Sequence, residues 1–395
     1  MSNEPVTAGR IDPRDFLDID VLLSDEERLL RDTVRSFVAD RVLPDVADWF
    51  EEGTFPVELA KEMGALGLLG MHLDGYGCSG TSAVAYGLAS TELEYGDTGV
   101  RSFASVQGSL AMFPIWAFGS EEQKQEWLPR MAAGEVIGCF GLTEPDAGSD
   151  PGAMRTTARR QGDDWVLDGT KMWITNGGIA DIAIVWARSE DGILGFIVPT
   201  DAAGFSTNDI QRKMSLRASV TSELVLDGVR LPDSALLPGV RGLKGPLSCL
   251  SEARFGILFG VVGSARACFE AALEYTTERK AFGKPIGSFQ LIQRQLVEIM
   301  MGVNRGMLLA MHLGRKKDLG TLNSAHISMG KLDNVRMALE AARTARGMLG
   351  ANGITLEYPV IRHMNNLESV YTYEGTNEIH TLILGQALTG LSAFQ

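Results

Sequence analysis

One acidic residue near the C-terminus stands where an acid or base could be held beside a buried site. Glu374 lies in the run Tyr373-Glu374-Gly375-Thr376, and Thr376 is a candidate N-cap for a following helix. Two interpretations are open. The acid could simply be favoured by the dipole of the helix N-terminus. It could also be a general base whose pKa is raised by burial, with Gly375 letting a ligand approach the backbone closely.

Arginines at two other places could bind anions. Arg101 follows Glu94 and precedes Ser105 in the run ELEYGDTGVRSFAS. Such an arginine is usually exposed, but in a pocket its guanidinium would bind a carboxylate through two hydrogen bonds. Arg279 ends one predicted helix and Gln290 begins the next. Arg279 could therefore serve the helix C-terminus or bind a phosphate.

Two runs in the middle of the chain could contact a flat cofactor. The run CFGLTEPDAGSD, residues 139–150, leads from an apolar strand into a turn whose amides and hydroxyls could cradle a polar ring or a phosphate. An ordinary strand-ending turn has the same composition. In KMWITNGG, residues 171–178, Trp173 is most simply a core residue, although it could flank an aromatic cofactor.

A glycine pattern near residue 75 resembles a dinucleotide-binding fingerprint. Gly75, Gly77 and Gly80 fit G-x-G-x-x-G, and Glu94 follows at about the required distance of 20 residues. The expected context is wrong, because a helix and not a strand is predicted before the glycines, and Glu94 falls inside the next helix. We interpret the run as a turn between helices.

Composition excludes several classes of protein. The 395 residues carry a formal charge of −14, which argues against general nucleic-acid binding. Four scattered cysteines and five histidines show no metal-binding spacing, so we expect reduced thiols, no metal and a cytoplasmic protein. No window approaches 18 consecutive apolar residues, so no membrane span is expected. The N-terminal residues 1–16 show no targeting segment.

The elements that must position these residues change character twice along the chain. Residues 22–135 have helical periodicity, with capping boxes at Ser24 and Ser120 and a helix predicted to open at Pro56. Residues 136–237 contain short runs rich in β-branched residues, separated by turns, which predict β-hairpins. From about residue 245 three long amphipathic helices follow, and a last helix is predicted near Thr376.

We therefore predict an α+β multidomain protein in three parts. Residues 1–135 form an N-terminal helical domain, residues 136–240 a barrel-like or sandwich-like β-domain, and residues 241–395 a four-helix bundle.

Together, the ordered motifs LTEPDAGSD, WITNGG, RKAFGKPIGSFQ, MLGANGI and YEGTNEIHTLILGQALTG resemble the acyl-CoA dehydrogenase family from about residue 20 to the C-terminus. The resemblance implies FAD at the junction of the β-domain and the C-terminal bundle, usually in a homotetramer. It implies α,β-dehydrogenation of an acyl-CoA thioester, with Glu374 as the base that removes the α-proton. An electron-transferring flavoprotein would accept the electrons.

The same resemblance assigns the binding residues by their motifs. Flavin contacts are expected from Phe140, Leu142, Thr143, Gly148, Ser149, Trp173, Ile174 and Thr175. Further FAD contacts, often from a neighbouring subunit, are expected from Arg279, Phe282, Gln290, Gly347, Leu349 and Gly350, with Thr376 and Glu378 beside them. Contacts to CoA and the acyl chain are expected from Ser149, Leu247, Leu250, Arg254 and Gly375.

Within the family, the runs at 92–110 and 215–229 and the C-terminal run are similar to those of glutaryl-CoA dehydrogenases. That likeness implies that Arg101, Ser102 and Ser105 bind the distal carboxylate of a dicarboxylic acyl chain, with Glu94 and Tyr373 orienting Arg101. A family member that acts on monocarboxylic chains has no need of such an arginine, because a buried unpaired charge is costly.

Three alternatives to a decarboxylating glutaryl-CoA dehydrogenase stay open. The chain could be a short-chain monocarboxylic acyl-CoA dehydrogenase, or a glutaryl-CoA dehydrogenase that does not decarboxylate. It could also be a catalytically silent flavoprotein that acts as an assembly partner. The intact Glu374 argues against the silent protein, because loss of the base would be the simplest route to inactivity.

Overall fold

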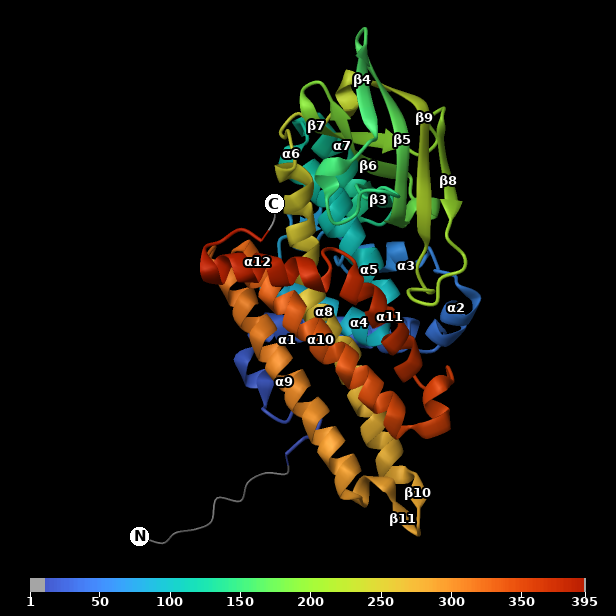
Figure 1. The fold of residues 1–395 in the computed structure, drawn as a ribbon, viewed down its shortest axis with the longest axis vertical. Coiled ribbons are helices and arrows are strands. Elements are labelled where there is room, and N and C mark those ends of the chain that lie inside the picture. The colour runs from blue at the N-terminus through green and yellow to red at the C-terminus, as the bar shows by residue number, and fades with distance from the viewer. Residues whose placement is uncertain (1–10, 394–395) are drawn as a thin grey trace.

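The computed structural model describes residues 11–393 and arranges them as helices, a β-sheet and further helices (Figure 1). This order confirms the predicted fold class. The predicted absence of a targeting segment concerns residues 1–16, of which 1–10 lie outside the described residues. The first helical part comprises α1 (Asp25–Arg41), α2 (Val46–Glu52), α3 (Leu59–Ala65), α4 (Ala83–Gly96), α5 (Thr98–Ser105), a π-helical stretch (Val106–Met112), α6 (Phe113–Phe118) and α7 (Glu121–Ala132).

In the N-terminal part, two of the three predicted helix starts are confirmed. Ser24 and Ser120 each form a capping box, in which the hydroxyl accepts a hydrogen bond from the third helical residue. The prediction for Pro56 is wrong. The amide of Leu59 donates to the Pro56 carbonyl at 3.1 Å, so the proline lies in a turn before α3.

The glycine run near residue 75 forms the turn of a short antiparallel hairpin. Its strands are β1 (Asp74–Gly75) and β2 (Cys78–Ser79), and Glu94 lies in α4, as expected. The segment 66–73 before the hairpin consists of turns, where we expected a helix. Neither arrangement gives the strand-turn-helix unit that a dinucleotide site requires.

The central part is one sheet of seven strands in the order β3-β6-β4-β5-β9-β8, with β7 paired to β6. Strand β3 runs parallel to β6, whereas β5, β9 and β8 form an antiparallel series. Residues 182–187 of β6 are all buried, as expected of a strand covered on both faces. The strands are β3 (Gly138–Gly141), β4 (Thr157–Gln161), β5 (Asp164–Thr175), β6 (Ile182–Ser189), β7 (Gly192–Pro199), β8 (Phe205–Asp209) and β9 (Thr221–Pro232).

The C-terminal part contains one helix more than the sequence predicts. The extra helix, α11, was missed because its buried face carries Arg362, His363 and Asn366, which interrupt the apolar periodicity. The helices are α8 (Lys244–Glu278), α9 (Gln290–Asp318), α10 (Ser324–Met348), α11 (Val360–Thr372) and α12 (Asn377–Thr389), with a hairpin of β10 (Lys280–Ala281) and β11 (Lys284–Pro285) after α8.

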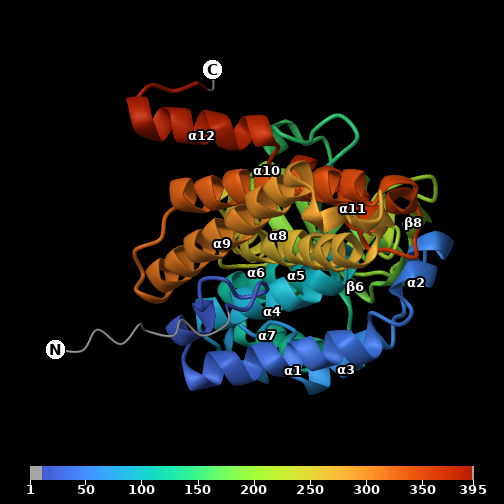
Figure 2. The same cartoon turned by 90° about the horizontal axis from the view of Figure 1, so that it is seen from below.

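Helix α4 lies between α1 and the layer of α8, α9 and α10, and is buried along nearly its whole length (Figure 2). Glycines allow this close approach. A Cβ on Gly263 of α8 would collide with the backbone carbonyl of Thr91, and a Cβ on Gly87 of α4 would meet the ring of Phe259. The close packing brings the C-terminal end of α4 against the middle of α8.

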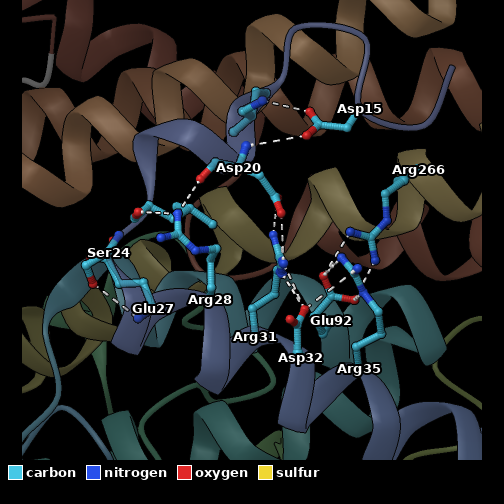
Figure 3. A network of polar contacts seen from close by, with 12 residues as sticks. Asp15, Asp20, Ser24, Glu27, Arg28, Arg31, Asp32, Arg35, Glu92 and Arg266 are labelled. Atoms are coloured by element: carbon cyan, nitrogen blue, oxygen red, sulfur yellow. Dashed lines mark hydrogen bonds and ion pairs between the residues drawn. The ribbon is translucent and has the colours of Figure 1, made fainter. Parts of the chain in front are cut away.

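Ion pairs to the buried Glu92 fasten α1 and α8 to α4 (Figure 3). The Glu92 carboxylate of α4 accepts hydrogen bonds from Arg35 of α1 at 3.0 Å and from Arg266 of α8 at 2.6 Å. Burial alone would raise the pKa of Glu92, but the two arginines lower it to about 2. Next to them, Arg31 pairs with Asp20 and ties the segment before α1 to that helix.

Two helices, α8 and α9, are long and apolar enough to cross a membrane by length and composition. The apolar window of α8 is 78% buried inside the protein, as befits a core helix, whereas that of α9 is 33% buried. The four cysteines are free, and no group of three metal-ligating side chains occurs within residues 11–393.

Candidate active site

Glu374 lies in the short connection between α11 and α12. Thr376 caps α12, as predicted, by accepting a hydrogen bond from the amide of Ile379 at 3.3 Å. Glu374 itself has a φ of 52° and Gly375 a φ of 94°. A left-handed conformation is costly for a residue with a side chain, and such strain is often found at functional sites.

Glu374 is half-buried, and its carboxyl lies among cations. Burial raises its pKa to about 7, although Arg254, Lys331 and Arg101 each favour the charged form. One carboxyl oxygen, Oε2, is buried and has no hydrogen-bond partner among the described residues. A carboxylate that titrates near neutral pH with an oxygen free for substrate is suited to general base catalysis.

Arg101 is buried, so the interpretation as an exposed arginine is wrong. Its Nε donates to the Glu94 carboxylate at 2.6 Å and its Nη2 to the Tyr373 hydroxyl at 2.5 Å. These are the two contacts that the sequence predicted. Burial acts against the charge of Arg101, but Glu94 and Tyr373 raise the pKa, so the guanidinium stays charged. The buried hydroxyls of Ser102 and Ser105 have no partner among the described residues.

These side chains reach one place from four separate elements. Glu94 lies in the last turn of α4, Arg101 belongs to α5, Tyr373 follows α11, and Arg254 lies in α8. Arg254 Nε donates to the backbone carbonyl of Glu374 at 2.6 Å. The predicted carboxylate-binding group and the predicted base are therefore parts of one cluster. Leu247 and Leu250, the two other predicted acyl-CoA contacts on α8, are exposed and half-buried and precede Arg254 on the same helix.

The predicted flavin contacts of the sheet come from two adjoining segments. The Met172 amide donates to the Thr143 carbonyl at 2.8 Å, which joins the turn after β3 to β5. Trp173 lies at an irregularity in the β5–β9 pairing, with a φ of 63°, and 60% of it is exposed. The core interpretation of Trp173 is therefore wrong. Phe140, Leu142 and Ile174 are buried, Thr143 and Thr175 are half-buried, and Gly148 and Ser149 are exposed.

This donor set fits a flavin. An indole held out of the core offers an aromatic face, and the adjoining turn supplies hydroxyls and backbone amides. A Cβ built on Gly148 would meet nothing within 4 Å, so space is available above that turn. When FAD is bound, we expect residues 140–149 and 173–175 to hold its ring system.

The other predicted FAD contacts lie elsewhere in the chain. Arg279, Phe282 and Gln290 belong to the β10–β11 hairpin and the start of α9, at the end of the molecule away from the sheet (Figure 1). Gly347, Leu349 and Gly350 lie at the end of α10, and the next segment is tied to α8 by the hydrogen bond from Asn352 to Tyr275. Within one chain, the residues of the hairpin therefore lie apart from the sheet that carries Trp173 (Figure 1). Thr376 and Glu378, at the start of α12, lie next to Glu374 in the chain.

Sequence reasoning missed two residues of the site. Lys331 of α10 is buried, and its Nζ donates to the Tyr373 carbonyl at 2.5 Å and to the Gly375 carbonyl at 2.7 Å. His380 of α12 is buried beside Gly375, and its Nδ1 lies 3.1 Å from the Ser328 hydroxyl. A lysine within the apolar period of α10 is the one signal that could have drawn attention.

Comparison with known proteins supports the family resemblance that the sequence motifs indicate. Three family models match it in order: the acyl-CoA dehydrogenase N-terminal domain at residues 24–135, the middle domain at 139–229 and the C-terminal domain at 240–389.

Solved structures and curated sequences agree with these matches. The crystal structure of a glutaryl-CoA dehydrogenase from Mycobacterium smegmatis is 64% identical, with a TM-score of 0.96, and covers 98% of this chain and 100% of its own. Another from that organism, in complex with FADH2, is 61% identical with the same coverage and TM-score. The mitochondrial short-chain specific acyl-CoA dehydrogenase of Bos taurus is 35% identical over 372 residues, 92% of this chain and 90% of that protein. The chain belongs to the acyl-CoA dehydrogenase family and is an oxidoreductase.

Proposed function

We propose that the protein is an FAD-dependent glutaryl-CoA dehydrogenase. It oxidises glutaryl-CoA to glutaconyl-CoA, decarboxylates that intermediate to crotonyl-CoA and CO2, and passes the electrons to an electron-transferring flavoprotein. The observation that carries the proposal is the cluster of Arg101, Glu94 and Tyr373 beside the buried hydroxyls of Ser102 and Ser105. The 64% identity to a glutaryl-CoA dehydrogenase supports it.

The cluster suits a dicarboxylic acyl chain better than a monocarboxylic one. Arg101 has five N–H donors, and its bonds to Glu94 and Tyr373 use only some of them. The distal carboxylate of a glutaryl chain would accept hydrogen bonds from the guanidinium and from Ser102 and Ser105. An apolar chain end would leave these buried donors unpaired, which costs about 1–3 kcal/mol for each group.

Glu374 removes the α-proton of the thioester, for which its carboxylate must be ionised. FAD, when bound, supplies the acceptor for the hydride that leaves the β-carbon. Arg254 fixes the Glu374 backbone through its carbonyl. The proton that Glu374 takes up can then be returned to the carbon from which CO2 departs. The hydrogen bonds from Arg101, Ser102 and Ser105 set the orientation of the carboxylate that leaves as CO2.

A homotetramer is part of the proposal. The FAD contacts of the β10–β11 hairpin lie far from the sheet in one chain, so a second subunit has to supply them (Figure 1). Phe282, at the tip of that hairpin, is 95% exposed. Helix α9 also leaves several apolar side chains exposed, namely Leu291, Val297, Met301 and Leu308. Cysteines that form no disulfide favour a reducing compartment, for which we propose the cytoplasm.

The proposal is tested by mixing the purified flavoprotein anaerobically with glutaryl-CoA or with butyryl-CoA. We expect faster bleaching of the flavin with glutaryl-CoA, and the release of crotonyl-CoA and CO2. Glutaconyl-CoA as the final product would identify a dehydrogenase that does not decarboxylate. A clear preference for butyryl-CoA would overturn the substrate assignment and favour a short-chain enzyme.

A further inference from the structure

Three consecutive backbone carbonyls around the proposed base accept hydrogen bonds from two cations, the buried Lys331 and the half-buried Arg254. Lys331 Nζ binds the carbonyls of Tyr373 and Gly375, at 2.5 and 2.7 Å, and Arg254 Nε binds that of Glu374 at 2.6 Å. The two cations come from different helices, α10 and α8. The backbone on both sides of Glu374 is therefore fastened to the helical core, independently of the carboxyl group.

This backbone has a reason to need fastening. A non-glycine residue with a φ near 52° is strained, so surrounding contacts must hold it there. Gly375 next to it has a φ of 94°, so the turn has few rigid torsions of its own. Without the bonds from Lys331, the turn could relax and move the Glu374 carboxyl away from the α-carbon of a bound thioester. A displacement of about 1 Å can cost on the order of 10²-fold in rate.

Lys331 is also one of few charges that face Glu374. Arg254 of α8 and Arg101 of α5 are the other cations that favour its ionised form. Burial raises the pKa of Tyr373 and of the Cys249 thiol in α8, so both stay neutral. Burial and the nearby cations lower the pKa of His380 in α12 to about 3, so it is neutral as well. The remaining acid, Glu94 of α4, is paired with Arg101.

We propose that Lys331 is a positioning residue for the catalytic base, holding the strained Glu374 turn through the carbonyls on either side of it and favouring the ionised carboxylate. The inference rests on the proposed role of Glu374 and deepens it. Burial lowers the pKa of Lys331 to about 7, while Glu374 acts in the opposite direction, so each group promotes the charge of the other.

Three substitutions separate the charge of Lys331 from its hydrogen bonds. Lys331→Arg keeps the cation and its donors, Lys331→Gln keeps a donor without the charge, and Lys331→Met keeps neither. The measurement is the rate of flavin reduction from pH 5.5 to 9, because the rate of a general-base reaction follows the ionisation of the base. At each pH the acyl-CoA concentration is varied up to saturation, which gives the maximal rate and KM. Each variant is compared as the flavin-loaded enzyme, with FAD content and melting temperature recorded.

We expect the acid limb of the rate profile to move to higher pH by about one unit in the Gln and Met variants, because a favourable charge is lost. The Met variant should also lose about 10- to 100-fold in maximal rate with a much smaller change in KM, because the turn is no longer held. Lys331→Arg should restore the position of the limb. If the Met variant does not fold, the comparison of Gln with Arg decides.

Lys213 offers a matched control. It is half-buried, its Nζ donates to the carbonyls of Leu216 and Ser219, and Leu216 has a φ of 51°. Lys213→Met should lower the melting temperature without moving the acid limb. Flavin-loaded Gln and Met variants of Lys331 with an unshifted limb would overturn the inference. Flavin reduction by Glu374→Gln would instead overturn the proposed base, whatever the Lys331 variants do.

Discussion

At Glu374 two opposing effects set the chemistry of a single residue. Burial raises the pKa of the carboxyl to about 7, whereas the cations around it favour the charge. A buried carboxylate that titrates in this range is basic enough to accept a proton and still ionised in a large fraction of molecules at neutral pH. Its unpartnered Oε2 is the atom to which we assign the proton transfer.

Glu374→Gln should retain FAD and acyl-CoA binding but lose flavin reduction by on the order of 10²-fold or more, because shape is kept and the base is removed. In the wild type, the rate should rise as the pH increases through about 7, since only the ionised carboxyl accepts the proton. Stopped-flow absorbance of the flavin measures both. Near-normal reduction in the variant would show that another group takes the proton.

The sequence identified the residue types of the site more reliably than their surroundings. Arg101 and Trp173 illustrate why. Taken alone, each had a common interpretation, an exposed arginine and a core tryptophan, and the structure reverses both. Exposure depends on which distant elements cover a residue, such as Tyr373 on Arg101. Only the resemblance of the whole set of motifs pointed to the right environment.

The packing of α4 on α8 determines the shape of the Arg101 site at the scale of elements. A Cβ on Gly260 of α8 would collide with the Glu94 carboxylate and lie 3.2 Å from Arg101 Nε. Glu94 and Arg101 hold each other, so neither can move away without breaking a buried ion pair. The glycine is therefore required by the neighbouring helix, since its own backbone is ordinary helix.

Gly260→Ala should destabilise the protein by about 1–3 kcal/mol through overpacking, and should impair turnover of glutaryl-CoA more than of butyryl-CoA. Gly385→Ala in α12 is the control, because a Cβ there meets nothing within 4 Å and alanine is the better helix former. Melting temperatures and kcat/KM for the two thioesters test this. If Gly260→Ala and Gly385→Ala had the same melting temperature and the same kcat/KM values, the packing argument would be contradicted.

The ion pairs of Glu92 make the junction of α1, α4 and α8 sensitive to acid. The pKa of Glu92 is about 2 in the folded protein, below its ordinary value of 4.5. The ionised Glu92 therefore adds about 3 kcal/mol to the free energy of unfolding. This stabilisation is complete above about pH 4.5 and is lost as the pH falls towards 2.

Glu92→Gln should lower the melting temperature at pH 7, and the gap to the wild type should narrow as the pH falls below about 4.5. Glu62→Gln, which breaks the exposed pair with Arg41, should change little at any pH. Thermal unfolding of both variants across this pH range provides the measurement. A gap between Glu92→Gln and the wild type that is independent of pH would argue against the linkage.

Periodicity predicted the long helices and the hairpins but not every element. Long helices with many apolar turns, such as α10, were visible even though Lys331 and Asn334 are buried in it, and so was the change to short β-branched runs at residue 136. Helix α11 was not, because polar residues interrupt the apolar ones on its buried face: Arg362 donates to the Gly96 carbonyl and pairs with Asp97. Such partners are distant in sequence and become visible only in the folded chain.

On the scale of the whole molecule, the separation of the β10–β11 hairpin from the sheet links cofactor binding to assembly (Figure 1). Phe282 is almost fully exposed, has a φ of 51° and lies edge-to-face with Phe289. A large aromatic side chain presented in this way is typical of an interface. The sequence placed these residues in the FAD site, but could not show that a single chain holds them apart from Trp173.

Phe282→Asp should weaken subunit association and FAD retention together, because a charge would be buried at the proposed contact. The cluster of Glu94, Arg101 and Tyr373 lies in a separate part of the chain. Any flavin-loaded fraction of the variant should therefore still prefer glutaryl-CoA to butyryl-CoA. Sedimentation and the ratio of flavin to protein, measured on the same samples, are the readouts. A monomeric variant with full flavin content would refute the shared cofactor site.

The central claim, that Arg101 selects a dicarboxylic substrate, is tested most directly by the ratio of kcat/KM for glutaryl-CoA to that for butyryl-CoA, in wild type and in Arg101→Gln. Losing a charged partner from a buried carboxylate should cost roughly 2–5 kcal/mol, a factor of about 30 or more for glutaryl-CoA. Butyryl-CoA has no distal carboxylate, so its turnover should stay the same or rise, and the ratio should collapse. Lysine at this position should rescue poorly, since it lacks the planar fork. If both values fall by the same factor, Arg101 is a structural residue and the glutaryl-CoA assignment is contradicted.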